Sequence, residues 1–273
     1  MAGMGHFLAT TITKVELSSN GIPIGSATGF FLKQTHEWYL VTNWHVLSGR
    51  DNESGQPRHK SGAIPDRCTF YAARFYEDKF GWFPATVNLV DQNANPTWFG
   101  HPTEGQNVDV AVVPLGSPDL GLAKDMLDPS GYDANMFIDL GQDVFIPGYP
   151  LGLSSAGKMA IWKRASVASS LEFGAGINRF IYVDTATREG MSGAPCIAIS
   201  NWRHYSLDRS TNKMRVVERP LSCRLLGTYS GRKNPSDSFE AQIGVVWREN
   251  LIFETIAGRT AGSFELRGQR PSR

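Results

Sequence analysis

Short segments in which apolar and polar residues alternate recur along the chain and predict a protein built mainly of β-strands. Residues 7–17 and 22–32 form two such segments, and the polar, glycine-containing stretch 18–21 between them is typical of a hairpin turn. Further strands are expected around 67–76 and 82–90. Because apolar runs rich in β-branched and aromatic residues favour strands over helices, we expect an all-β fold.

Two of the predicted strands border a residue that can carry out chemistry. The apolar segment 38–41 ends in a Thr-Asn pair, which favours the start of a helix. His45 is therefore expected at the beginning of a short helical turn. Asp109 is the only charge at the mouth of the segment 108–115, which is rich in β-branched residues. Its carboxylate is expected to be either a capping group or a buried hydrogen-bond acceptor.

A glycine-rich turn supplies a third candidate group. Residues 187–196 read Thr-Arg-Glu-Gly-Met-Ser-Gly-Ala-Pro-Cys and place Ser192 in a G-x-S-G-x-P motif ahead of an apolar segment that predicts a buried strand. Gly190 lacks a Cβ and can adopt backbone conformations closed to most residues. The N–H groups of Gly190 and Ser192 could then point to one spot, as an oxyanion hole requires. Alone, such a motif is more often an ordinary turn.

The three residue types together indicate nucleophilic catalysis. In a Ser-His-Asp triad, the histidine takes the proton of the serine hydroxyl, and the aspartate fixes the histidine tautomer and stabilises the imidazolium. The chain presents His45, Asp109 and Ser192 in that order, each at the border of a predicted strand. We therefore predict that these residues are the general base, its orienting acid and the nucleophile.

Five blocks in sequence order give the chain a resemblance to the chymotrypsin-fold, trypsin-like serine proteases, and most closely to their bacterial Deg/HtrA-type branch. The blocks are residues 25–31, 41–46, 108–112, 148–152 and 184–195. The resemblance implies two six-stranded antiparallel β-barrels, with the triad in the cleft between them and a short C-terminal helix. It also implies that the N–H groups of Gly190 and Ser192 are the oxyanion donors.

The resemblance also implies a domain organisation. We expect an N-terminal barrel with His45 and Asp109 in residues 1–120, a linker in 121–138, a C-terminal barrel with the nucleophile, the specificity pocket and the helix in 139–258, and a basic flexible tail in 259–273. Most Deg-type proteases carry a PDZ domain, and no PDZ-sized segment is expected here. That difference puts their trimeric assembly and their recognition of substrate tails in doubt for this chain.

The resemblance further implies which residues contact the substrate. The residue six positions before the serine, which floors the pocket for the side chain preceding the scissile bond, is Ala186. The strand that pairs with the substrate backbone is 227–231, and Gly244 belongs to the far wall. The expected substrate-binding residues are Ala186, Thr228, Tyr229, Ser230, Gly231 and Gly244. An uncharged floor predicts a preference for small or medium aliphatic residues.

Composition excludes some other functions. The chain has 273 residues, 41% of them hydrophobic, and a net charge of +1, which gives no bulk electrostatic reason to bind nucleic acid. No metal or cofactor is expected, because His59 and His101 lack partners at metal-ligand spacing. The three cysteines (Cys68, Cys196 and Cys223) are too few for a disulfide framework. Reduced thiols are therefore favoured, although a bridge between Cys196 and Cys223 stays open.

The expected location is the cytoplasm of a bacterial cell. The first residues lack the basic region and apolar run of a signal peptide. No apolar stretch approaches the roughly 18 residues that cross a bilayer. In this respect the chain differs from the typical periplasmic members of the resembled branch.

Two questions stay open at the level of sequence. Met191 stands where digestive relatives carry the aspartate that captures a newly cut N-terminus, so activation by a protein partner or by self-association is more plausible than zymogen cleavage. The polar, basic insert 201–222 is either a solvated hairpin or a docking surface. We expect a serine endopeptidase acting on polypeptides. The alternatives are a latent protease of a stress or defence system, and a catalytically silent peptide-binding module.

Overall fold

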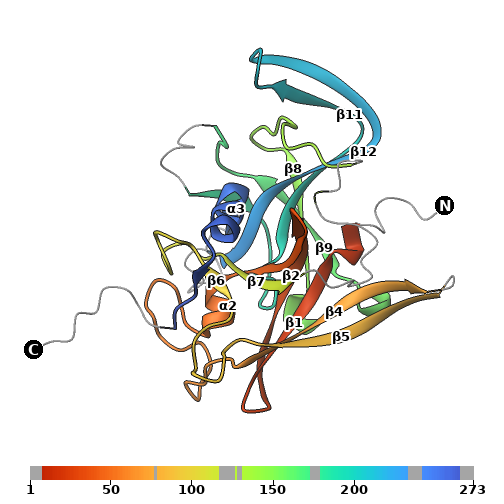
Figure 1. The fold of residues 1–273 in the computed structure, drawn as a ribbon. Helices are drawn as coiled ribbons and strands as arrows, with labels where there is room; N and C mark the ends of the chain where they lie inside the picture. The colour runs from red at the N-terminus through yellow and green to blue at the C-terminus, as the bar shows by residue number, and fades with distance from the viewer. Residues whose placement is uncertain are drawn as a thin grey trace, which may run out of the picture.

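The described part of the chain is built mainly of β-strands, in two sheets that follow one another along the sequence except for β14, which returns to the first sheet (Figure 1). The computed structural model describes residues 8–76, 79–116, 127, 131–172, 179–232 and 242–264. The first sheet contains β1 (Ile12–Ser19), β2 (Ile22–Gln34), β3 (Glu37–Thr42), β4 (Arg67–Tyr76), β5 (Lys79–Asn88), β6 (Phe99–Gly100), β7 (Ala111–Gly116) and β14 (Thr260–Ala261). The second contains β8 (Asp143–Gly148), β9 (Ile161–Val167), β10 (Phe180–Asp184), β11 (Pro195–Asp208), β12 (Lys213–Arg232) and β13 (Ile243–Arg248).

The second sheet is a closed barrel in the order β10-β13-β12-β11-β8-β9, with antiparallel pairing between the described neighbours. This confirms the predicted all-β fold and the six-stranded C-terminal barrel. The first sheet has eight strands in the order β14-β6-β7-β3-β2-β1-β4-β5. It exceeds the predicted six because the two-residue strands β6 and β14 extend one edge.

Two α-helices accompany the sheets in the parts described here. Helix α2 (Trp44–Ser48) follows β3 directly, as the sequence predicts, and ends at Gly49 in the left-handed conformation. Helix α3 (Glu249–Gly258) is the predicted C-terminal helix, and it packs against β12, β13, β6 and β7. No helix in the described part of the chain combines the length and the apolar character needed to span a bilayer.

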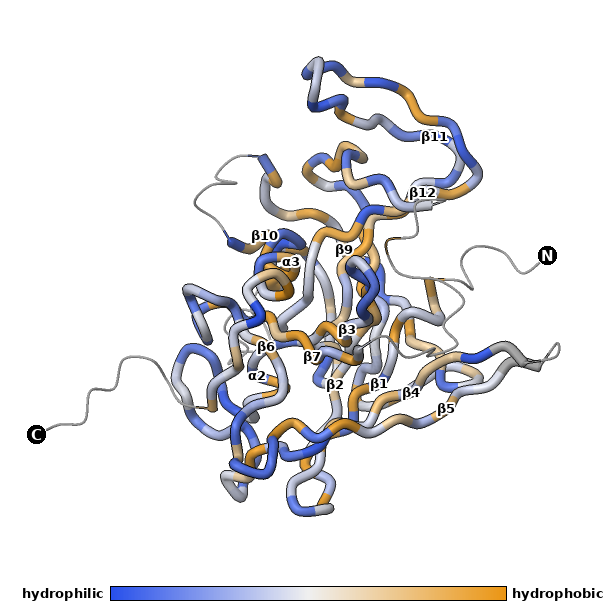
Figure 2. Tube along the Cα trace, viewed as in Figure 1, coloured by the Kyte–Doolittle hydropathy of each residue, from blue (hydrophilic) through white to orange (hydrophobic). Residues whose placement is uncertain are grey.

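The core joins the two sheets. One buried cluster contains Phe30, Tyr39 and Val110 from the first half of the chain together with Ile197 and Trp247 from the second half. Two further clusters fill the first sheet and the closed barrel separately. Figure 2 shows the apolar residues concentrated along the central strands, with hydrophilic stretches along the hairpin that extends outward from β11 and β12. The contact between the two sheets is therefore a hydrophobic interface.

The chain after α3 differs from the expected tail. Thr260 and Ala261 form β14 and pair with β6, and the N–H of Gly262 donates to the carbonyl of Trp98. These contacts return the end of the chain to the first sheet. Residues 265–273 of the predicted tail, and residues 121–126 and 128–130 of the predicted linker, lie outside the described residues.

The insert 201–222 continues β11 and β12 beyond the barrel as a regular antiparallel hairpin, which we call the insert hairpin. Its first strand is held at the base, where the N–H of Phe137 donates to the carbonyl of Tyr205 and the ring of His204 lies 2.8 Å from Asp133. Several large apolar side chains of the hairpin are exposed, namely those of Trp202, Tyr205, Met214 and Val216. The three cysteines are buried and form no disulfide, so Cys196 and Cys223 are not bridged.

Candidate active site

Strand pairing brings His45 and Asp109 together. Strands β3 and β7 are antiparallel neighbours, with Thr42 opposite Ala111, so the end of one strand lies beside the start of the other. His45 is on the first turn of α2, immediately after β3. Asn43 occupies the N-cap position of α2, but its side chain makes no capping hydrogen bond and instead donates from Nδ2 to the backbone carbonyl of Asp109 at 2.7 Å. The local order strand, cap, helix therefore aims the histidine at the carboxylate.

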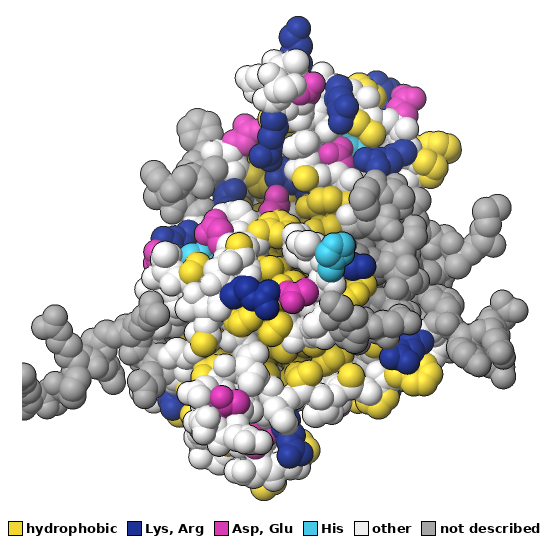
Figure 3. Space-filling model, in the orientation of Figure 1, with side chains coloured by type: hydrophobic (Ala, Val, Ile, Leu, Met, Phe, Trp, Pro, Cys, Tyr) yellow, Lys and Arg dark blue, Asp and Glu magenta, His cyan; other side chains and the backbone are white. Residues whose placement is uncertain are grey.

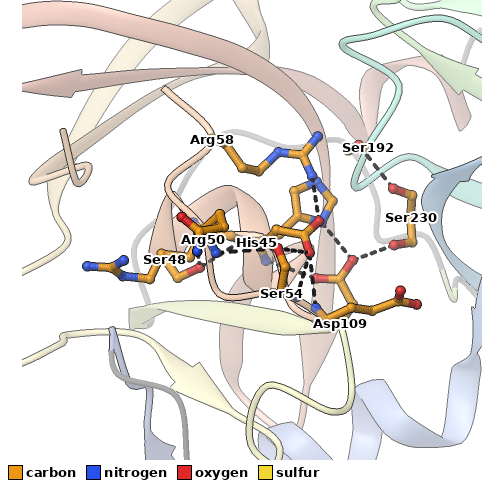
Figure 4. Close-up of polar contacts among 11 residues, drawn as sticks. His45, Ser48, Arg50, Ser54, Arg58, Asp109, Ser192 and Ser230 are labelled. Atoms are coloured by element: carbon orange, nitrogen blue, oxygen red, sulfur yellow. Dashed lines mark hydrogen bonds and ion pairs between the residues drawn. The ribbon is translucent and has the colours of Figure 1, made fainter. Parts of the chain in front are cut away.

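The His45–Asp109 pair is buried and tightly bonded (Figure 4). The Nδ1–H of His45 donates to Asp109 Oδ2 at 2.7 Å, and the backbone N–H of His45 donates to Oδ1 at 2.8 Å. The hydroxyl of Ser230 also donates to Oδ2. Burial alone would raise the pKa of the Asp109 carboxyl, but the His45 ring and these hydrogen bonds hold that pKa below its ordinary value. Asp109 is thus an ionised acceptor at neutral pH.

Ser192 lies in a turn between β10 and β11 that is held by the first sheet. The N–H of Thr28 donates to the carbonyl of Ser192 at 2.9 Å, and the Thr28 hydroxyl donates to the carbonyl of Gly190 at 2.8 Å. Gly193 has a φ of 86°, and a Cβ on it would lie 2.0 Å from the carbonyl oxygen of Thr28. Only glycine fits there, so the close approach of β2 shapes the turn that presents the serine.

The structure brings His45, Asp109 and Ser192 to one site, but the serine hydroxyl is bonded elsewhere than to the histidine. Its Oγ–H donates to the backbone carbonyl of Ser230 at 3.2 Å. Ser230 therefore links Ser192 and Asp109, since its own hydroxyl donates to the Asp109 carboxylate (Figure 4). The sequence reasoning placed Ser230 only on the substrate wall. Its contact with Asp109 spans 121 residues of chain, and no local pattern signals it.

The backbone around Gly190 leaves two N–H groups without a backbone partner in the described residues. The carbonyl of Glu189 accepts from the N–H of Leu151 at 2.6 Å. In a trans peptide the N–H points opposite to the carbonyl, so the N–H of Gly190 points away from Leu151. Within the described ranges, the N–H groups of Gly190 and Ser192 donate to no backbone acceptor. They are available to bind a negatively charged oxygen.

Two clefts open at this site, and both are lined by His45 and Ser192. The larger has a volume of about 540 Å³ and is bounded by β12 and β13 and by the residues before the serine. The smaller has a volume of about 490 Å³ and lies against β2, the loop at 58–65 and Leu151. The catalytic candidates thus stand where the two clefts meet, so an extended chain could pass through both.

The larger cleft contains some of the predicted substrate-binding residues. Tyr229, Ser230 and Gly231 line it, whereas Thr228 is fully buried and Gly244 packs against the Tyr229 ring. Ala186 is exposed and does not line the cleft, in contrast to the predicted floor.

The physical reason for this difference is the alternation of side chains after β10. It buries Thr185 and Thr187 and turns Ala186 outward. Thr187 lines the cleft in place of Ala186, and it is hydrogen-bonded to the hydroxyl of Tyr229. No cluster of three or more His, Cys, Asp or Glu side chains suited to a metal ion occurs within the described residues.

Comparison with known proteins gives one family. The model of the trypsin-like peptidase domain matches residues 27–205. The active form of the Rv3671c protease from M. tuberculosis is 16% identical, with 95% of this chain and 85% of that chain covered and a TM-score of 0.51. The serine endoprotease from Yersinia pestis is 12% identical over 92% of this chain and 63% of that chain, with a TM-score of 0.49. A search of curated proteins finds no match. The first of these structures confirms the chymotrypsin-like fold.

Proposed function

The chain belongs to the trypsin-like peptidase family, and from this we propose that it cleaves polypeptides by attack of Ser192 on the scissile carbonyl, with His45 as general base and Asp109 as its orienting acid. The observation that carries the proposal is the buried His45–Asp109 hydrogen bond of 2.7 Å beside the cleft that contains Ser192. A buried carboxylate that accepts from Nδ1–H leaves Nε2 as the free, basic nitrogen of the ring.

The chemistry follows from these positions. His45 Nε2 accepts the hydroxyl proton as Ser192 Oγ attacks, and it later donates that proton to the leaving amine. Asp109 stabilises the imidazolium formed in between, and the acyl group passes through a covalent ester with Ser192. The N–H groups of Gly190 and Ser192 bind the oxyanion, where each such donor contributes about 10²- to 10³-fold to kcat.

The serine hydroxyl has to rotate before it can react. In the structure it donates to the Ser230 carbonyl, and that carbonyl belongs to the strand expected to pair with the substrate backbone. A substrate N–H that bonds the same carbonyl competes with the hydroxyl for it. Binding of substrate therefore favours the rotation that turns the hydroxyl toward His45.

The space beside Ser192 suits a small side chain. The Tyr229 ring is buried, and a Cβ on Gly244 would lie 2.6 Å from it. The hydroxyl of Tyr229 is bonded to Thr187, which fixes the ring across the pocket. We propose that this ring, rather than an apolar floor at Ala186, limits the residue before the scissile bond to alanine, valine and residues of similar size.

The substitution Tyr229→Val should let the pocket accept a larger side chain before the scissile bond. Removing the ring opens volume for leucine or phenylalanine, so the ratio of kcat/KM for Leu over Ala substrates should rise by about 10-fold or more. A matched peptide series that varies only this residue measures the ratio. Tyr229→Phe keeps the ring and should leave the preference unchanged. Cleavage by the wild type strictly after Lys or Arg, or an unchanged ratio in a folded Tyr229→Val, would contradict the assignment.

Labelling with a fluorophosphonate probe tests the proposed function directly. The probe reacts with an activated serine, so the wild type should be labelled at Ser192, as located by mass spectrometry. Ser192→Ala removes the acceptor atom and His45→Ala removes the base, and both variants should be unlabelled while remaining folded by circular dichroism. Equal labelling of the wild type and His45→Ala would show that His45 does not activate the serine.

A latent protease is the second candidate, because the Ser192 hydroxyl is bonded to Ser230 instead of His45. In that case the purified wild type stays unlabelled, and labelling appears after cell lysate is added. The activating partner or second copy would then be required to turn the hydroxyl toward the base. A folded wild type that stays unlabelled under both conditions and still binds peptides would instead be a peptide-binding module.

A further inference from the structure

A third cavity lies apart from the active site, at the start of α3 and beneath the base of the insert hairpin. Its volume is about 510 Å³, and none of its lining residues borders either active-site cleft. Figure 3 shows basic side chains gathered over the part of the molecule where the insert hairpin lies. Three arginines line the cavity, Arg209, Arg224 and Arg248, and we call it the arginine pocket.

Two of these guanidinium groups are fixed in place but only partly bonded. Arg224 donates from Nη1 to the carbonyl of Met136 at 2.7 Å, and Arg248 donates from Nη1 to the carbonyl of Leu171 at 2.8 Å. Within the described part of the chain, Nε of both arginines and Nη2 of Arg248 are buried without a partner. An unpaired buried donor on a charged group is costly, so these atoms are suited to a ligand that supplies acceptor oxygens.

One internal carboxylate only partly compensates the three positive charges. Glu249 Oε1 lies 3.5 Å from Nη2 of Arg224. Burial raises the pKa of Glu249 above its ordinary value, although Arg224, Arg209 and Arg248 act in the opposite direction. Glu172 also lines the cavity, but its side chain is exposed. With both glutamates ionised, three positive charges face two negative ones, so the cavity lining keeps a surplus of positive charge. The two carboxylates therefore compete poorly with an added anion for the arginines.

Apart from Asn135 and Asn250, the remaining walls are apolar. They are formed by the side chains of Phe137, Ile138, Leu171, Ile181, Leu207 and Leu226. A cavity of this volume accepts a ligand of small-molecule size, and apolar walls with a few placed charges are typical of such sites. A strongly hydrated inorganic anion would leave these walls uncovered, so the lining fits an anion with an apolar body.

We propose that the arginine pocket binds an apolar carboxylate, whose oxygens take the free donors of Arg224 and Arg248 and whose hydrocarbon part lies on the apolar walls. Arginine presents paired N–H groups that match the two oxygens of a carboxylate. Two sources share this chemistry, namely the C-terminus of an apolar peptide and a free organic acid. The inference rests on this cavity alone and stands independently of the proposed peptidase mechanism.

Calorimetric titration of the full chain carrying Ser192→Ala, which removes the candidate nucleophile so that peptides stay intact, tests the proposal. The probes are an acetylated Ala-Ala-Leu peptide with a free carboxylate, the same peptide as its C-terminal amide, and octanoate. The acid should bind at least about 10-fold more tightly than the amide, since charge-assisted hydrogen bonds are lost with the charge. Binding of octanoate as well identifies a general acid site, and binding of the peptide acid alone identifies a peptide C-terminus.

Substitutions in the arginine pocket test whether the acid binds there. Arg248→Met should weaken binding of the acid by about 10-fold or more, whereas Glu249→Gln should strengthen it because the competing carboxylate is removed. Arg209→Met is a second variant, which removes no side-chain hydrogen bond to the described residues, and it should also weaken binding. Arg203→Met, on the exposed part of the insert hairpin, is the matched control and should have no effect. Equal affinity for acid and amide, or an acid affinity that none of the pocket variants changes, would overturn the proposal.

Discussion

Replacing Ser192 with alanine is expected to lower kcat on a peptide substrate by about 10⁶-fold, the loss that follows removal of a catalytic serine nucleophile. The alanine lacks the attacking oxygen, and among the described residues the substitution breaks a single side-chain hydrogen bond, from Oγ to the Ser230 carbonyl. The fold and the clefts should therefore persist, so KM should change little. Progress curves at high enzyme concentration, with thermal unfolding of both proteins, measure the loss and exclude misfolding.

Ser230→Ala is the matched control for this experiment. It removes a serine hydroxyl from the same site and one hydrogen bond to Asp109, but it keeps the backbone carbonyl. Loss of a hydrogen bond to a charged group corresponds to a decrease of about 10- to 100-fold. Losses of equal size in the two variants would show that Ser192 is not the nucleophile.

Asp109→Asn should lower kcat by about 10⁴-fold, the effect of removing the orienting carboxylate from a Ser-His-Asp triad. Asparagine has the same shape, so the site stays packed. However, its amide N–H₂ donates to His45 Nδ1, which moves the ring proton to Nε2 and blocks acceptance of the serine proton. The backbone N–H of His45, which donates to Oδ1 of Asp109 now, keeps the amide oxygen as its acceptor. The Ser230 hydroxyl, which donates to Oδ2 now, faces the amide nitrogen and accepts from it instead.

The chain offers its own control for this substitution. Asp133 and His204 form a second buried carboxylate–imidazole pair, 2.8 Å apart, at the base of the insert hairpin. Asp133→Asn makes the same chemical change in a similar environment outside both active-site clefts. It should leave kcat within a few-fold of the wild type. If it lowers kcat as much as Asp109→Asn does, the loss reflects weakened folding and not the histidine tautomer.

Features that depend on short stretches of sequence could be predicted. Three features carry such a local signal. The β1–β2 hairpin has alternating apolar and polar residues, the helical turn at His45 follows an N-cap residue, and the turn at Ser192 has a glycine motif. Strand pairing then places such segments at the border between the sheets. The predicted order of His45, Asp109 and Ser192 thus corresponds to one site in space.

Features that depend on packing between distant segments could not be predicted. The ring of Tyr229 fills the pocket because Gly244 and Thr187 lie against it, and neither is near it in sequence. Ala186 turns outward because of the exact register at the end of β10. Strands β6 and β14 have two residues each, too few for any periodic pattern.

The contacts of Thr28 imply that the first sheet and the second barrel have to evolve as a matched pair. This residue of the first sheet holds the carbonyls of Gly190 and Ser192, and its own carbonyl excludes any side chain at position 193. A chimera that joins β1 to β7 of this chain with the second barrel of a relative would transplant the serine without the surface that shapes its turn. Recombination between such proteins should therefore succeed only when both parents share threonine at 28 and glycine at 193.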